Sequence, residues 1–114
     1  LKKNLTLDGS AYEIFQRATK IVFSMIKEIN NTKIVPKPQS ISQISFKRLT
    51  RKDNQLDFNK IKNLNEIYDR IRMVDAPGYP CAFEDYKNFV INFYNAKKIR
   101  KTLYASVKIN IKKK

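Results

Sequence analysis

The first thirty residues carry the clearest helical pattern in the chain. Ser10-Ala11-Tyr12-Glu13 has the form of a capping box, in which the Ser10 hydroxyl and the Glu13 carboxylate each accept a backbone N–H at the start of a helix. Asn30-Asn31-Thr32 provides a stop. Between these signals, apolar residues recur every three or four positions and form one stripe: Ile14, Ala18, Ile21, Val22, Met25 and Ile29. The pattern predicts an amphipathic helix that begins after Ser10 and ends near residue 31.

The next segment predicts extended structure. Pro36 and Pro38 fix their own backbone angles and disfavour helix at the residues before them, so they predict a connector. Residues 41–46 alternate apolar and polar side chains and predict a short strand. Residues 53–58 predict a turn and a second short extended piece.

The remaining half alternates one helix with strands. Asn63 is a cap-like residue that predicts a second helix, and this helix must end before Pro77. Period-two patterns predict strands over 82–86, 89–93 and 103–111, of which the last is the clearest. We therefore predict an α+β protein: an N-terminal docking helix, a linker, and a small open β-barrel of four or five strands with one inserted helix.

The charge of the chain changes the functional picture. It holds 24 Lys and Arg against 10 Asp and Glu, for a net charge of +14, which favours RNA, DNA or an anionic membrane as partner. A lysine-rich composition with solvated side chains is the alternative. Two groups of cations concentrate the charge. The first cationic cluster is Lys47, Arg48, Arg51 and Lys52, and the second is Lys97, Lys98, Arg100 and Lys101.

Residue types also exclude several chemistries. The chain has no histidine and one cysteine, Cys81, so serine and cysteine triads, histidine proton shuttles, the common zinc sites and an internal disulfide are not expected. We predict no catalytic residue and no metal site, and we interpret Cys81 as a small packed residue. The sequence has no signal-peptide pattern and no transmembrane-length apolar run, so we expect a cytoplasmic protein that does not bind membranes.

Three stretches in order resemble a known family. Residues 45–58 carry an aromatic, basic residues, an acidic turn and an apolar-acid-aromatic triplet. Residues 67–73 contain an Ile-Arg pair, and residues 77–83 form a Pro/Gly-rich loop that leads to Ala-Phe. This order is similar to the C-terminal region of methionyl-tRNA formyltransferases and of the related sugar-nucleotide N-formyltransferases. Gly78-Tyr79-Pro80 and Asp57-Phe58 depart from the usual motifs, which leaves the acceptor open.

The resemblance implies an organisation. Residues 1–33 would be the terminal helix of a catalytic domain that lies outside this chain, residues 34–40 a linker, and residues 41–114 the OB-like barrel. The catalytic domain would use 10-formyltetrahydrofolate through an Asn, a His and an Asp. Because this chain has no His, it would carry neither the active site nor the cofactor, and no catalytic residue is transferred to it.

Three functional hypotheses stay open. In the first, the chain is a non-catalytic accessory domain whose two cationic clusters position tRNA against its own catalytic domain. In the second, the acceptor is an amino-sugar nucleotide, and the module packs against the catalytic domain or a homodimer partner. In the third, it is a free-standing nucleic-acid-binding barrel.

Other residues have more local interpretations. We expect Arg72 to bind the loop 75–80 or a backbone carbonyl, and Pro77, Gly78 and Pro80 to make that loop rigid. Four aromatics are interpreted either as core or as a base-stacking platform: Tyr79, Phe83, Tyr86 and Phe93.

Overall fold

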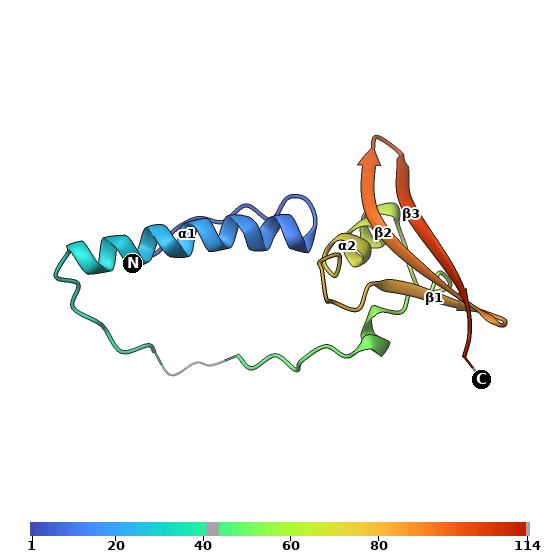
Figure 1. Ribbon diagram of the computed structural model, residues 1–114, viewed down its shortest axis with the longest axis horizontal. Helices are drawn as coiled ribbons and strands as arrows, with labels where there is room; N and C mark the ends of the chain where they lie inside the picture. Colours follow the sequence, from blue (N-terminus) through green and yellow to red (C-terminus); the bar gives the residue numbers. More distant parts are fainter. Residues whose placement is uncertain (41–43, 114) are drawn as a thin grey trace.

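The chain forms an elongated α+β structure with principal extents of 59 × 31 × 28 Å. The computed structural model describes residues 1–40 and 44–113. A long N-terminal helix occupies one end and a three-stranded sheet the other, with a short helix against the sheet (Figure 1). The elements in chain order are α1 (Ala11–Asn31), the 3-10 helix η1 (Arg51–Asn54), α2 (Leu64–Arg72), β1 (Ala82–Tyr86), β2 (Phe89–Ile99) and β3 (Thr102–Ile111).

The start of α1 is the predicted capping box. The Ser10 amide donates to Glu13 Oε2 at 2.7 Å, and the Glu13 amide donates to Ser10 Oγ at 3.3 Å. Gly9 precedes the cap with φ of +82°, and a side chain at this position would collide with the Glu13 carboxylate. The glycine therefore combines a left-handed turn with a close approach to the cap.

We expect the cap of α1 to depend on pH. Hydrogen bonds from the Ser10 amide and hydroxyl hold the pKa of Glu13 below its ordinary value of 4.5. A lowered pKa means that the ionised Glu13 carboxylate stabilises the folded state. This contribution is present above pH 4.5 and is lost as the pH falls through the folded-state pKa. Glu13→Gln should thus be less stable than the wild type near neutral pH, and this difference should shrink below pH 4.5 in thermal unfolding monitored by circular dichroism. An equal difference at both acidic and neutral pH would contradict the assignment.

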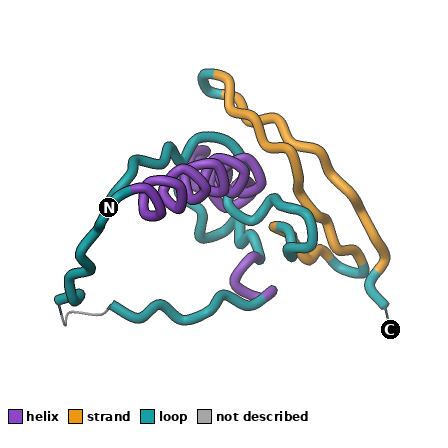
Figure 2. Tube along the Cα trace, turned by 60° about the vertical axis from the view of Figure 1, so that its left-hand side comes forward, coloured by secondary structure: helices purple, strands orange, loops and turns teal. Residues whose placement is uncertain are grey.

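The sheet is antiparallel with strand order β1-β2-β3, so two hairpins connect neighbouring strands. One face of the sheet packs on α2 (Figures 1 and 2). The core there consists of the buried side chains of Leu56, Ile71 and Ala82. Partly buried apolar side chains surround these three: Ile61, Ile67, Val74, Phe93, Ala96 and Leu103.

A β-bulge divides β2 into two parts. Tyr94 lies opposite Ser106, and Lys97 lies opposite Tyr104. The two residues of β2 between these pairs therefore face a single residue of β3. Asn95, inside the bulge, has φ of 51°, and its backbone N–H donates to Asp75 Oδ2 at 2.9 Å. Such an insertion reverses the faces to which the following side chains point. Lys98 consequently lies opposite Leu103, which packs on the core.

Most predicted elements are confirmed. The α+β class, both helices and the three strands of the C-terminal half are present. The expected strand over 41–46 is wrong where it can be compared, because residues 44–46 are irregular; Ile41, Ser42 and Gln43 lie outside the described residues. Residues 53–58 contain the end of η1 and a single bridge, Gln55 to Phe83, which agrees with the predicted turn and short extended piece. The described residues thus form an open three-stranded sheet instead of four or five strands.

A candidate nucleic-acid interface

The first cationic cluster lies on an exposed extended segment and on η1 that follows it. Asp53 holds η1 together, because its Oδ2 accepts from the Thr50 amide at 2.6 Å and from the Thr50 hydroxyl at 2.8 Å. These hydrogen bonds lower the pKa of Asp53, and Lys47 and Lys52 lower it further by their charge. The Arg51 guanidinium lies over the Phe83 ring, 5.1 Å from its centroid. Arg51 is thereby fixed against the sheet.

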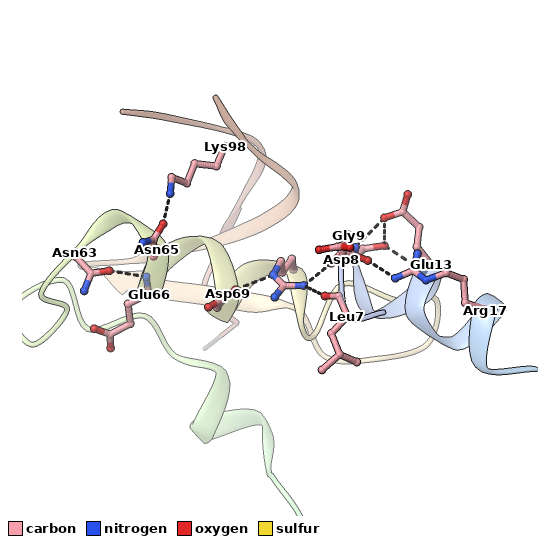
Figure 3. A network of polar contacts seen from close by, with 12 residues as sticks. Leu7, Asp8, Gly9, Glu13, Arg17, Asn63, Asn65, Glu66, Asp69 and Lys98 are labelled. Atoms are coloured by element: carbon pink, nitrogen blue, oxygen red, sulfur yellow. Dashed lines mark hydrogen bonds and ion pairs between the residues drawn. The ribbon is translucent and has the colours of Figure 1, made fainter. Parts of the chain in front are cut away.

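The second cationic cluster lies at the far end of the β2–β3 hairpin. Lys97 and Lys98 belong to the end of β2, and Arg100 and Lys101 to the turn that follows. The Lys98 ammonium contacts Asn65 Oδ1 on α2 (Figure 3). Lys97 and Lys98 border a cavity of about 940 Å³ between the start of α1, α2 and β2. Its walls also include Tyr12, Glu13, Tyr68 and Arg72.

The structure does not bring the two clusters together. The turn after β2 lies at one end of the sheet and η1 near the other (Figures 1 and 2). Arg51 borders one pocket, and Lys97, Lys98 and Arg100 border two others; none of these three pockets has residues of both clusters. They form two separate cationic surfaces.

A third surface was not predicted from the sequence. The sheet face opposite α2 carries a groove of about 780 Å³, which we name the sheet groove. It places Arg51 of the first cationic cluster beside polar residues of β2 and β3. Its other lining residues include Phe83, Asn92, Tyr94, Lys108, Asn110 and Lys113. The alternating polar positions of β3 were visible in the sequence, but their neighbours depend on strand pairing.

The four aromatics proposed as a stacking platform do not share one surface. Phe83 pairs with Asn92 and borders the sheet groove. Phe93 packs on the core, on the opposite face, against Phe58 at 6.2 Å between ring centroids. Tyr79 contacts Phe15 of α1 at 5.7 Å, and Lys87 lies over Tyr86. A single platform is therefore a wrong interpretation of these residues.

Arg72 connects α2 to the segment before α1. Its Nη1 donates to the carbonyls of Leu7 at 2.6 Å and Gly9 at 2.9 Å, while its Nε contacts Asp69 Oδ1 at 2.7 Å (Figure 3). The Arg72 guanidinium thus binds two backbone carbonyls before α1 and the Asp69 carboxylate, and not the loop 75–80.

That loop is held by its own contacts. Asn54 Nδ2 donates to the Pro80 carbonyl at 2.7 Å, which ties η1 to the loop. Gly78 has φ of +78°, and the Asp75 carbonyl accepts from the Tyr12 amide at 3.2 Å. Pro77 lies between these contacts in the loop. Asp75 thus joins the loop to the start of α1, and Asn54 joins it to η1.

Cys81 has a polar neighbourhood. Its Sγ donates to Asn92 Oδ1 at 3.4 Å, and a hydrogen bond with Cys81 together with burial raises the pKa of Tyr94. Across residues 1–40 and 44–113, no three His, Cys, Asp or Glu side chains are grouped so that they could hold a metal ion. Within the same ranges, no helix combines the length and apolar character needed to cross a membrane.

These features define a small α+β module: an N-terminal helix, an extended connector, and a sheet with one packed helix and exposed cationic clusters. The family described as methionyl-tRNA formyltransferase, C-terminal domain, matches residues 43–110, which is more than half of the chain. The chain belongs to this family.

A solved structure supports the same assignment. Methionyl-tRNA formyltransferase from Clostridium thermocellum is 35% identical, with a TM-score of 0.90. The match covers 98% of this chain and 49% of that protein, so the chain spans about half the length of its solved relative. No curated protein sequence matches the chain.

Proposed function

We propose that the chain is the non-catalytic accessory part of a formyltransferase of the methionyl-tRNA type, and that it holds tRNA by its two cationic clusters. One observation supports the tRNA contact most directly. In the described part of the chain, none of the eight cluster cations takes part in an ion pair with a carboxylate. Exposed cations without acidic partners can replace the counterions of a phosphate backbone.

The chemistry would belong to a catalytic domain that uses 10-formyltetrahydrofolate. We propose that α1 packs against this domain, with residues 1–33 as its terminal helix, 34–40 as the linker and 41–114 as the accessory module. Phe23 supports this assignment, because an aromatic side chain is 66% exposed in the middle of α1. Val22, Ile26 and Ile29 are also exposed, so α1 has an apolar surface that the described part of the chain does not cover.

An amino-sugar nucleotide acceptor is the alternative, with a mainly structural role for this module. The exposed side chains of Val107, Ile109 and Ile111 on β3 favour it, because they could pack on a second subunit. The two cationic clusters would then have no role in binding the acceptor. The family assignment leaves the third hypothesis, an unrelated nucleic-acid-binding barrel, without support.

A salt series of tRNA binding tests the proposal. We expect a Kd of about 1 μM near physiological salt and a steep loss of affinity as salt rises. Replacing Lys47, Arg48, Arg51 and Lys52 with alanine should weaken binding about tenfold and reduce the slope of log affinity against log salt by about 0.7 to 0.9 per lost phosphate contact. Fluorescence anisotropy with labelled tRNA measures both quantities.

A matched variant separates position from total charge. Lys20, Lys27, Lys33 and Lys37 are four exposed cations on α1 and the connector. Their replacement with alanine removes the same charge and should change tRNA affinity less than twofold. If both variants lose equal affinity, only net charge matters. If the wild type does not bind, the amino-sugar nucleotide alternative becomes the better explanation.

A further inference from the structure

The sheet groove lies on the side of the sheet that α2 leaves uncovered. Strand pairing builds its floor, because Phe83 lies opposite Asn92, and Asn92 lies opposite Lys108. Val90 and Asn110 form the next pair along the same face. On the other face, Ala82 and Phe93 pair and pack on the core. The alternation of the strands therefore separates the core face from a groove face on which polar side chains lie beside Phe83 and Val90.

The groove has an excess of positive charge. Arg51, Lys108, Lys112 and Lys113 line it, against one acidic residue, Asp85. Lys112 Nζ lies 3.6 Å from Asp85 Oδ1, which compensates that carboxylate. In the described part of the chain, the other three cations form no ion pair. The groove thus favours an anionic ligand.

The other features of the groove suit a planar ring that has hydrogen-bonding groups along its edge. One side of the Arg51 guanidinium rests on Phe83, whose side chain is only 7% exposed. Arg51 also lines the groove, and a planar guanidinium can stack on a nucleobase. The Asn92 amide already accepts from Cys81 and donates to the Lys108 carbonyl. The Asn110 amide makes no side-chain hydrogen bond within the described residues, so it can bind the edge of a base.

We propose that the sheet groove binds an unpaired segment of an RNA strand. A base would stack on Arg51, Asn110 would bind a base edge, and Lys108 and Lys113 would contact the flanking phosphates. Only an unpaired base exposes a ring face for stacking, which excludes a regular duplex as the ligand. This inference rests on the proposed function, because it takes the acceptor to be RNA, and it adds a site outside both cationic clusters except for the shared Arg51.

Arg51→Lys provides the test, because it keeps the charge and removes the planar group. The full chain is titrated with a labelled, unstructured oligoribonucleotide and with a duplex of the same length. We expect the variant to bind the single strand about tenfold more weakly and the duplex unchanged. Asn110→Ala should also weaken single-strand binding without changing its salt dependence. Lys20→Arg is the control for exchanging one cation for the other at an exposed site, and it should have no effect. Thermal unfolding checks that each variant is folded.

Three results would overturn the proposal. The first is single-strand affinity that is unchanged in Arg51→Lys and Asn110→Ala. The second is a wild-type chain that binds the duplex as tightly as the single strand. The third is equally tight binding of an acidic peptide of the same charge. If tRNA binds with steep salt dependence while the groove variants behave as wild type, the groove inference fails and the proposed function stands. If the oligoribonucleotide binds through the groove while tRNA does not bind, the groove stands and the proposed acceptor is wrong.

Discussion

Leu56→Ala is expected to lower the free energy of unfolding by about 3 kcal/mol. Leu56 is fully buried, and its contacts join the segment after η1 to Ile71 of α2 and Ala82 of β1. Its amide also donates to the Phe83 carbonyl at 2.7 Å, which fixes the backbone and prevents the site from collapsing around a smaller side chain. The truncation would therefore leave a cavity in the centre of a small core. Urea denaturation of the chain, followed by circular dichroism, measures this loss.

Leu49→Ala is the matched control for this prediction. Leu49 is the same residue type in the neighbouring extended segment, but it is 71% exposed. Its truncation should change stability by less than about 0.5 kcal/mol. A comparable loss in both variants would show that Leu56 does not belong to the core as described.

Arg72→Ala should lower the free energy of unfolding by about 2 kcal/mol, mainly because it breaks the junction between α2 and the segment before α1. Arg72 is the better buried arginine of α2, with a side chain 16% exposed. Charged hydrogen bonds to the carbonyls of Leu7 and Gly9 contribute more than its ion pair with Asp69, because the Asp69 side chain is largely exposed to water. The variant should also release the first ten residues, which limited proteolysis would detect as faster cleavage there.

Arg70→Ala is the matched control on the same helix. Arg70 forms an exposed pair with Glu66 at 3.2 Å, one turn away, and makes no hydrogen bond or ion pair with residues 1–10. We expect a loss of less than about 0.5 kcal/mol and no change in proteolysis. Arg72→Lys should recover only part of the stability, because an ammonium cannot place two donors in the same fixed plane. Equal behaviour of Arg70→Ala and Arg72→Ala would refute the junction as the cause.

Local signals made much of the fold predictable from the sequence. Ser10 with Glu13 and Asn63 with Glu66 mark helix starts by contacts over three residues, and both caps are present. Alternation likewise identified residues 89–93 and 103–111 as strands. In each case the determining interactions lie within a few residues of one another, so a short window of sequence contains them.

Features that depend on distant contacts were missed or incomplete. The bulge at Asn95 is stabilised by Asp75, twenty residues earlier, so no local sequence pattern predicts it. The two carbonyls that Arg72 binds lie more than sixty residues away. The sheet groove exists only once Lys108 is paired with Asn92 and Arg51 rests on Phe83. Charge identified the cationic clusters, but it could not show that they lie on separate surfaces.

The position of β3 bears on how the chain behaves at high concentration. It is the last strand of the sheet among the described residues, and an edge strand with free backbone groups can template pairing with another copy. Lys108 within β3 and Lys101, Lys112 and Lys113 beside it would bring like charges together in such a pairing. The lysines therefore act against aggregation while the chain is free. Once a polyanion neutralises them, that protection is lost, so assembly of the chain should depend on its ratio to nucleic acid.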